Sequence, residues 1–444
     1  MAADFSKTLG FTPNTNQENA LNRIVSFINS ENDVFILKGS AGTGKTSIVK
    51  AITSYLTEKD INFQIGAPTG RAAMIIGEKT QQVSKTLHSQ IYIPEKVENG
   101  GVRFDRKENK EKDLTIFLVD EASMVSDQIS KSNNFFVTKP LLEEYIDFVK
   151  QGNPSNKIIF IGDRYQLPPV KQDFSPALKA KYLYDKYSLS CVEYELTKVM
   201  RQGAGSSILK TATSLRDLMS KGIMRGNVSI QREKYPSKAL KKYLSVFDNN
   251  SIDKVIAICS SNKDVDYWNR WIRRELGIAD RKLSVGDFVA TQTSWLNKEG
   301  QFVCKGEYGR ILNVDPSSEK YALLDFVNAD IEFIGSSGSR KIVSTKILLD
   351  SLDTKYGILE EQQEKYLYAE AMKHNADFRT SQNPSDDKYI GALRLKHAYA
   401  TTCHKAQGGE WENVLIHPWR LESNLQWAYT AITRAKENVY SYCA

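Results

Sequence analysis

A glycine-rich segment, GSAGTGKT at residues 39–46, directly follows the apolar run Val34–Leu37. A strand that leads into G-x-x-x-x-G-K-T and then into a helical pattern is typical of a P-loop. Glycines let the backbone turn its N–H groups toward a phosphate, and the N-terminus of the following helix adds positive potential. We therefore expect Lys45 to reach the outer phosphates of ATP and Thr46 to ligate Mg²⁺. The predicted ATP contacts of this segment are Gly39, Ala41, Gly42, Thr43, Gly44, Lys45 and Thr46. A chance glycine-rich turn is the alternative, which the flanking strand and helix disfavour.

The composition is that of an ordinary globular protein. The 444 residues suffice for two or three domains, and 41% of them are hydrophobic. The net charge of +7 fits a polyanionic partner, but an excess of solvated surface lysine would explain it equally well. The five cysteines are scattered and indicate neither a disulfide framework nor a zinc site, which favours a reducing compartment. Without a signal peptide or a long apolar run, we expect a soluble intracellular protein (cytoplasm or nucleoid) with no membrane partner.

Short apolar runs alternate with helical patterns over residues 11–170. The strand candidates are Val34–Leu37, Phe63–Ala67, Thr115–Val119 and Lys157–Ile161. Each is followed by a polar or glycine-containing turn, as buried parallel strands usually are. Ligand sites in such sheets lie at the carboxyl ends of the strands, so these turns are candidate site segments.

Residues 91–113 interrupt this alternation. They contain two short strand patterns around Asn99-Gly100-Gly101, followed by a charged tail. Because Asn-Gly strongly favours a two-residue turn, we predict a projecting β-hairpin. It is either a working part of the protein or a mere insertion.

The remainder of the chain predicts a second α/β domain with a β unit inserted into it. A strand–helix alternation covers residues 193–286, with an apolar run at Val255–Ile258 and an amphipathic stretch at Val265–Leu276. Between Asp287 and Tyr389 the pattern changes. Short runs typical of a small β-barrel (288–290, 310–312 and 321–324) precede a polar, helix-prone stretch, 353–387. Core-type patterning resumes at residue 395, and the tryptophans at 268, 271, 411 and 427 are expected in cores rather than stacked on bases.

Two polar segments follow predicted strands of the first half. Asp120-Glu121 closes the run Thr115–Val119, as in a Walker B motif, where Asp120 holds Mg²⁺ and Glu121 orients or deprotonates the attacking water. The alternative is a helix start whose dipole favours acidic side chains. Gln166, pinned by two prolines after the next strand, is expected to sense the terminal phosphate, although a capped turn is equally consistent with its sequence.

These motifs, together with later ones, resemble helicase superfamily 1. In chain order they are GSAGTGKT, APTGRAA (67–73), TLH (86–88), DEAS (120–123), GDRYQLPPV (162–170), LTKVMRQ (196–202), ATTCHKAQGGE (400–410) and YTAITRAKE (429–437). APTGRAA, TLH and HKAQG are most similar to the 5′-to-3′ branch, the Pif family with its RecD and Dda relatives. The barrel of that family usually carries N-G-E/D-x-G, whereas this chain has Lys305-Gly306-Glu307-Tyr308-Gly309.

The resemblance implies an α/β fold of two RecA-like P-loop lobes with parallel sheets. The first lobe would cover residues 1–190 and carry the hairpin insertion at 91–113. The second would comprise 191–286 and 391–444, interrupted at 287–390 by an SH3-like β-barrel with a helical extension.

The same resemblance implies roles for individual residues. Gln17 would read the adenine edge, and Gly409 and Glu410 would complete the ATP site. Arg201 and Arg434 would reach the γ-phosphate as arginine fingers, because charge on the transferring phosphoryl group needs cationic stabilisation; a surface ion pair is the alternative. The implied catalytic set is Lys45, Asp120, Glu121, Gln166, Arg201 and Arg434, with Thr46 and Asp120 at the metal. The implied DNA contacts, suited to sugar–phosphate binding, are Pro68, Thr69, Arg71, His88, Asn262, Lys263, Thr402, His404, Lys405 and Gln407. Coupling of the lobes or contact with the nucleotide is the alternative for His404 and Gln407, and a structural role is the alternative for His88.

The function implied is an ATP- and Mg²⁺-dependent DNA helicase that moves 5′-to-3′ on single-stranded DNA and separates duplex at single–double-strand junctions. It would act as a monomer on DNA, alongside repair or replication proteins. The family suggests G-quadruplexes and RNA–DNA hybrids as further substrates, and repair, recombination or telomere and genome maintenance as roles. The alternatives are a DNA-stimulated ATPase or translocase without unwinding, a scaffold subunit of a repair complex, an RNA helicase and a small-molecule kinase.

Overall fold

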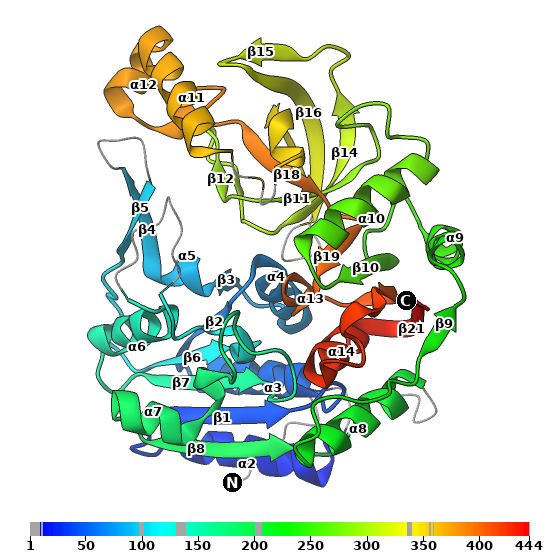
Figure 1. Cartoon of the computed structure of the whole chain (residues 1–444). Helices are drawn as coiled ribbons and strands as arrows, with labels where there is room; N and C mark the ends of the chain where they lie inside the picture. Colours follow the sequence, from blue (N-terminus) through cyan, green and yellow to red (C-terminus); the bar gives the residue numbers. More distant parts are fainter. Residues whose placement is uncertain are drawn as a thin grey trace. The chain divides into compact units, whose positions relative to one another are not determined.

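The computed structural model describes residues 9, 12–96, 102–129, 139–199, 207–334, 340–354, 357 and 359–443 (Figure 1). The chain divides into two compact units. The first comprises Met1–Glu95 and Arg103–Met224, and the second comprises Lys96–Val102 and Arg225–Ala444.

The first unit is built on a six-stranded parallel sheet in the order β3-β2-β6-β7-β1-β8. Its strands are β1 (Val34–Gly39), β2 (Asn62–Ala67), β3 (Ser84–Thr86), β6 (Thr115–Val119), β7 (Lys157–Gly162) and β8 (Cys191–Leu196). Its helices are α2 (Thr15–Ile28), α3 (Lys45–Glu58), α4 (Gly70–Thr80), α5 (Leu87–Ile91), α6 (Leu141–Gly152), α7 (Ala180–Tyr187) and α8 (Ser207–Ser220), with short 3₁₀ turns η1 (Ala122–Met124) and η2 (Pro176–Leu178).

Both faces of this sheet are buried, which explains why its strands are continuous apolar runs. Alternate residues of β1 enter different cores: Phe35 and Leu37 pack with α2, α3 and α4, whereas Val34 and Ile36 pack with α5, α6 and α7. The four strands predicted for residues 11–170 are all present.

The first unit extends beyond the predicted boundary at residue 190. Strand β8 pairs with β1 in parallel, so residues 191–196 belong to the first sheet and not to a second lobe. Helix α8 also lies in the first unit, which ends at Met224.

The predicted hairpin is present as a two-stranded sheet of β4 (Tyr92–Lys96) and β5 (Val102–Arg106). Its predicted turn, Asn99-Gly100-Gly101, lies outside the described residues.

The second unit contains a five-stranded parallel sheet in the order β19-β10-β20-β21-β9. Its strands are β9 (Gln231–Glu233), β10 (Val255–Cys259), β19 (Ala400–Thr402), β20 (Trp411–Ile416) and β21 (Ala435–Tyr442). The associated helices are α9 (Pro236–Val246), α10 (Asn262–Glu275), α13 (Cys403–Ala406) and α14 (Leu425–Ile432), with η5 (Pro418–Arg420). Trp268, Trp411 and Trp427 are fully buried, as expected of core residues, whereas Trp271 is half-buried.

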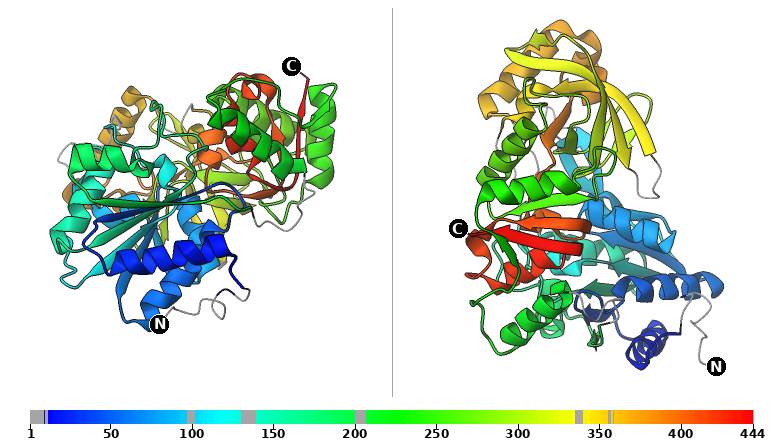
Figure 2. Two further views of the ribbon diagram at one scale, coloured as in Figure 1. Left: turned by 90° about the horizontal axis from the view of Figure 1, so that it is seen from below. Right: turned by 90° about the vertical axis from the view of Figure 1, so that its right-hand side faces the viewer.

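A closed β-barrel is inserted between β10–α10 and β19. Its order is β14-β11-β18-β17-β16, closed by pairing of β14 with β16. The strands are β11 (Phe288–Thr291), β14 (Tyr308–Val314), β16 (Leu324–Ile334), β17 (Arg340–Leu348) and β18 (Leu393–His397), flanked by β15 (Glu319–Tyr321) and the ribbon of β12 (Trp295–Leu296) and β13 (Phe302–Val303). Beside it lie η3 (Leu349–Leu352), α11 (Glu361–His374), α12 (Ala376–Ser381) and η4 (Pro384–Asp386). In the right-hand view of Figure 2, the long strands β16 and β17 (yellow) curve around the barrel.

Two details differ from the predicted barrel. Strand β18 belongs to it, although residues 391–444 were assigned to the second lobe. The run 321–324 is not one strand: Tyr321 ends β15 and Leu324 begins β16, and the two residues between them, Ala322 and Leu323, form a turn with φ of 48° and 63°. Among the described residues, none of the helices combines the length and apolar character of a membrane span.

Candidate active site

The P-loop joins the carboxyl end of β1 to the N-terminus of α3. Gly42 and Gly44 have φ of 81° and 88°, a region that side chains other than glycine adopt at a cost. A Cβ at Gly39 would lie 2.6 Å from Oγ1 of Thr43, whose hydroxyl donates to the Ser40 carbonyl at 2.8 Å. The glycines of this segment are therefore required by the backbone path and by close packing.

Lys45 stands at the first position of α3. Its Nζ donates to the carbonyls of Gly39 at 2.7 Å and Ser40 at 3.3 Å, so the ammonium group lies on the loop itself. Each of these carbonyls is a weaker partner than a phosphate oxygen would be, because the latter is charged. Lys45 is thus placed to exchange backbone partners for phosphate.

A second cation reaches the same loop from α8. Nη1 of Arg216 donates to Oγ of Ser40, and Nη2 donates to Oγ1 of Thr213 at 3.1 Å. Arg216 is half-buried. Sequence analysis missed this residue, since it lies 176 positions from Ser40 in a helix without a recognisable motif.

Gln17 lies against the P-loop. Its side chain closes a capping box at the start of α2, where Oε1 accepts from Asn14 N at 3.2 Å and from Asn14 Nδ2 at 2.9 Å. Its Nε2 is so close to the loop that a Cβ at Gly44 would lie 2.4 Å away. Helix capping therefore fixes the orientation of the amide that the resemblance assigns to adenine.

The acidic pair follows β6. Asp120 N donates to the carbonyl of Gly66 in β2 at 2.9 Å, which holds the end of the strand in the sheet. Glu121 has a left-handed backbone with φ of 50°. Such a conformation is unfavourable for a glutamate and is concentrated at functional positions, so it supports a role for this carboxylate beyond that of a helix start.

Gln166 follows β7, the strand between β1 and β6. It is 2% exposed, and its N–H donates to the carbonyl of Asp163 at 3.2 Å. The carboxylate of Asp163 accepts from Tyr165 N at 3.0 Å. Because β1, β7 and β6 are parallel neighbours, their carboxyl ends bring the P-loop, Gln166 and Asp120 to one edge of the sheet.

Thr46 and Asp120 suit a divalent metal in their chemistry. A hydroxyl and a carboxylate oxygen are hard ligands of the kind Mg²⁺ takes, usually with substrate phosphates and water as the other ligands. No group of three or more His, Cys, Asp or Glu side chains able to hold a metal occurs within the described ranges. The chemistry of Thr46 and Asp120 thus fits a metal that is shared with a nucleotide.

In the second unit, Arg434 follows α14 and is 5% exposed. Its Nη1 donates to the carbonyl of Gly409 at 3.3 Å and its Nε to that of Thr430 at 3.2 Å. Glu410 is 3.9 Å from Nζ of Lys436. The structure therefore brings together Arg434, Gly409 and Glu410, which sequence analysis assigns to ATP. The other proposed finger, Arg201, lies outside the described residues.

The DNA contacts implied for the first unit lie at the ends of β2 and β3. Pro68 follows β2, and Thr69 caps α4 by accepting from Ala72 N at 3.2 Å. Arg71 lies in the first turn of α4 and is 5% exposed. His88 is exposed in α5, with its ring 5.9 Å from that of Tyr92.

The DNA contacts implied for the second unit gather at the ends of β10 and β19. Thr402 caps α13 by accepting from Lys405 N at 3.5 Å. Burial lowers the pKa of His404, so it is neutral at pH 7 and offers no fixed charge to a phosphate. Gln407 is fully buried. Asn262 and the exposed Lys263 begin α10.

Lys405 lies among other cations. Desolvation of its ammonium group lowers the pKa of Lys405, and the charges of Lys305 and Lys396 lower it further, while Asp266 opposes them. Three lysines from the turn before β14, from β18 and from α13 thus share one surface. Sequence analysis predicted only Lys405, since the other two come from the barrel.

Comparisons with known proteins agree with this architecture. The family model of the AAA domain matches residues 12–225, and that of the UvrD-like helicase C-terminal domain matches residues 397–441. The ATP-dependent DNA helicase dda of Enterobacteria phage T4 is 24% identical and covers 96% of this chain and 98% of its own length. The ATP-dependent RecD2 DNA helicase of Deinococcus radiodurans is 23% identical over 91% of this chain.

Solved structures show the same fold over nearly the whole chain. The Pif1 helicase from Candida albicans is 16% identical with a TM-score of 0.52, covering 98% of this chain and 95% of that one. The Pif1 helicase from Bacteroides in complex with ADP-AlF3 and ssDNA is 20% identical with a TM-score of 0.50, covering 95% and 91%. By these matches the chain is similar to the Pif1-like helicases of superfamily 1. The predicted α/β class, with two RecA-like lobes and an inserted barrel, is confirmed.

This Pif1-like chain is shorter than some of its relatives. It spans 46% of the RecD2 helicase and 36% of the uncharacterized protein MJ1519 of Methanocaldococcus jannaschii, to which it is 26% identical.

Proposed function

We propose that this Pif1-like chain is an ATP-dependent DNA helicase that moves 5′-to-3′ along single-stranded DNA. The observation that carries the proposal is the edge of the first sheet, where the P-loop, Asp120 with the strained Glu121, and Gln166 follow three neighbouring parallel strands. The direction of movement and the preference for single strands at junctions rest on the resemblance to the Pif and Dda proteins.

The first unit would bind ATP through the P-loop amides and Lys45. Thr46 and Asp120 would hold the accompanying Mg²⁺, which neutralises charge on the phosphates when bound. Glu121 would orient or deprotonate the attacking water, Gln166 would contact the terminal phosphate, and Arg216 would hold Ser40 in place.

The second unit would contribute Arg434, beside Gly409 and Glu410, to the γ-phosphate, together with Arg201. A guanidinium that reaches the γ-phosphate only when the lobes close makes closure depend on ATP and opening depend on hydrolysis. The DNA contacts assigned from the sequence in both lobes would grip a strand alternately, and the hairpin β4–β5 would separate the duplex.

The energetic cost of unwinding does not argue against this assignment, because separating one base pair costs only on the order of 1.4 kcal/mol in stacking.

G-quadruplexes, RNA–DNA hybrids and roles in repair, recombination or telomere maintenance stay proposals that the family suggests.

The test is strand separation on two matched duplexes, one with a 5′ and one with a 3′ single-stranded tail, in the presence of ATP and Mg²⁺. The Lys45→Ala variant is the control. We expect unwinding from the 5′ tail alone, lost in the variant. Unwinding from the 3′ tail alone would contradict the branch, and ATPase activity stimulated by single strands without any unwinding would point to a translocase or a complex subunit.

A further inference from the structure

Helix α10 forms one wall of a groove of about 750 Å³ in the second unit. The other walls are the segment 279–282 that follows α10, residues 352–353 after the barrel strands, and Lys396 and His397 of β18. Only Lys263, at one end of α10, belongs to the DNA contacts assigned from the sequence.

The groove carries seven cationic side chains against three carboxylates. Some of these charges are satisfied within the protein: Arg273 pairs with Asp287 at 2.8 Å, and Lys396 pairs with Asp266 at 3.1 Å. Lys263, Arg270 and Arg281 are exposed, and none of them forms an ion pair with any residue that the structure describes. Lys282 also pairs with Asp350 at 3.1 Å, and Arg274 is 3.9 Å from Glu275. The remaining excess of positive charge, carried by Lys263, Arg270 and Arg281, attracts external anions.

Aromatic rings alternate with arginines along the same face of α10. Tyr267 is 58% exposed, and its ring centroid is 5.6 Å from that of the half-buried Trp271. Arg270 and Arg274 lie three and seven positions after Tyr267, so they share its helical face. Exposed rings interleaved with cations are typical of surfaces that stack unpaired bases and bind the connecting phosphates.

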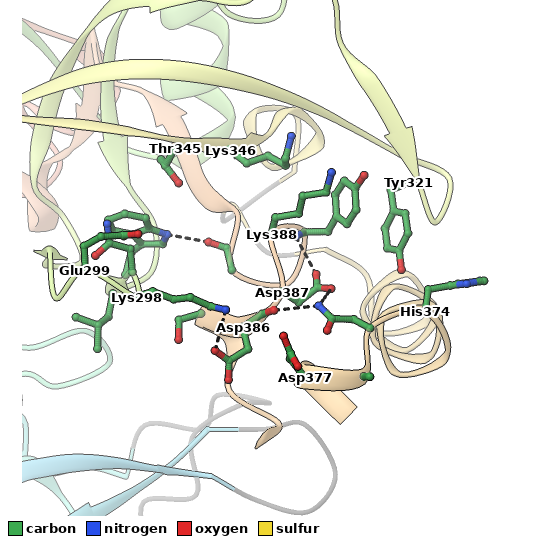
Figure 3. A pocket seen from close by; sticks show the side chains of 18 residues that line it. Lys298, Glu299, Tyr321, Thr345, Lys346, His374, Asp377, Asp386, Asp387 and Lys388 are labelled. Carbon is green, nitrogen blue, oxygen red and sulfur yellow. Dashed lines mark hydrogen bonds and ion pairs between the residues drawn. The ribbon is translucent and has the colours of Figure 1, made fainter. Parts of the chain in front are cut away.

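A second cavity of this unit shows that the pattern is not a general property of its surface. It measures about 670 Å³ and lies between the barrel and helices α11 and α12 (Figure 3). Its lysines are neutralised locally: Lys298 pairs with Asp386 at 3.3 Å, Lys346 pairs with Glu319, and Lys388 is 3.9 Å from Glu319. That cavity therefore offers no excess charge to a polyanion.

The α10 groove is continuous with the proposed DNA contacts. Lys396 lines the groove and also lies close enough to Lys405 to affect its charge state. A strand seated on Thr402 and Lys405 would thus pass Lys396 as it enters the groove.

We propose that the α10 groove is an additional binding site for single-stranded nucleic acid, which extends the path of the strand beyond the DNA contacts assigned from the sequence. The proposal rests on the proposed DNA helicase function. It assigns phosphate contacts to Arg270 and Arg281 and base stacking to Tyr267.

The test measures the affinity of the full chain for a series of oligothymidylates of increasing length. In the wild-type protein, affinity should keep rising with the length of the oligonucleotide after the DNA contacts assigned from the sequence are filled. The Arg270→Glu/Arg281→Glu variant should lose about tenfold in affinity for the longest strands, and the slope of log Kd against log salt should fall by about 1.4, or about 0.7 for each phosphate contact. Tyr267→Ala should weaken the binding of the longest strands at least about fivefold without changing the salt dependence.

The matched control is Lys238→Glu/Lys241→Glu on α9, which makes the same change in charge at two exposed lysines of the same unit. It should bind all lengths as the wild type does. An equal loss in this control, or an unchanged length dependence in both groove variants, would overturn the proposal while leaving the helicase assignment intact. A loss of affinity for duplex DNA but not for single strands in the groove variants would also overturn the proposal. Absence of any single-strand binding by the wild type would instead refute the proposed function.

Discussion

Replacing Arg216 by alanine is expected to weaken ATP binding without unfolding the first unit. The guanidinium donates to Ser40 in the P-loop and to Thr213 in its own helix, so in the variant ATP binding itself must supply the free energy that this contact contributes to ordering the loop. Such a hydrogen bond contributes about 1.5–3 kcal/mol when it is well buried. Arg216 is only half-buried, and solvent screening reduces this to about 1–2 kcal/mol. The dissociation constant for ATP should therefore rise about 5- to 30-fold.

The assay is titration with a fluorescent ATP analogue, accompanied by the KM of the DNA-stimulated ATPase. Arg216→Lys keeps the charge but loses the planar fork, so its dissociation constant should fall between those of the wild type and the alanine variant. Lys210→Ala is the matched control, since it removes an exposed cation from the same helix. A dissociation constant for Arg216→Ala within twofold of the wild-type value would refute the reasoning, as would an equal loss in Lys210→Ala.

Two further predictions concern the P-loop and the pH dependence of stability. Gly44→Ala should reduce ATP affinity at least about tenfold for two reasons. The new Cβ would lie 2.4 Å from Nε2 of Gln17. The alanine would also have to adopt a φ of +88°, a strain that costs about 1–2 kcal/mol. Gly222→Ala is the control, because it introduces the same kind of backbone strain (φ of +77°) at a position with open space around it. Equal losses of ATP affinity in the two variants would contradict this account. Burial lowers the pKa of His397 well below its ordinary value of 6.5, so the unfolded chain binds one more proton as the pH falls below 6.5. The free energy of unfolding should then fall by about 1.4 kcal/mol per pH unit below 6.5 on account of this group. Urea unfolding of His397→Gln should show that part of the slope removed, and an unchanged slope would rule out this origin.

The first sheet was largely predictable because parallel strands buried on both faces appear as unbroken apolar runs. Thr115–Val119 coincides with β6, and the other predicted strands differ from β1, β2 and β7 by at most two residues at an end. The glycine, lysine and carboxylate motifs directly after these strands are local in sequence. Their placement at one sheet edge follows from the parallel order alone.

Strand β8 shows that the sequence pattern of a strand does not identify the strand with which it pairs. Cys191–Leu196 alternates polar and apolar residues, and it lies at the edge of the sheet, where five of its six residues are exposed or half-buried. The pattern predicts a strand but not its partner. Pairing with β1 depends on contacts between segments more than 150 residues apart, so the predicted boundary at residue 190 was wrong.

The turn between β15 and β16 defeats prediction for a different reason. Ala322 and Leu323 occupy left-handed positions that normally favour Gly, Asn or Asp, and Leu323 is 87% exposed. The residues carry the apolar character of a strand but adopt the conformation of a hairpin turn. Pairing of the short strand β15 with the first residues of the long strand β16 must override the local preference here.

The candidate site likewise contains residues that a local sequence motif identifies and residues that only tertiary packing brings to the site. Motif residues such as Lys45 and Asp120 could be named because each lies beside a predicted strand. Arg216, Lys305 and Lys396 could not, since each joins its site through tertiary packing from an element without a motif.

One buried cluster joins the two segments through which the chain enters and leaves the barrel. The chain enters the barrel at Asp287 and leaves it near Tyr399, and the hydroxyl of Tyr399 donates to Asp287 at 2.9 Å. Arg273 of α10 donates to the two carboxylate oxygens of Asp287 at 2.8 and 3.0 Å. Burial nevertheless raises the pKa of Asp287, which means that desolvation outweighs these favourable contacts. An ion pair of this kind adds little net stability, but loss of either partner leaves a buried charge and costs about 3–5 kcal/mol. Because α10, the barrel entrance and the barrel exit share this cluster, the walls of the α10 groove are fixed relative to one another before any strand binds.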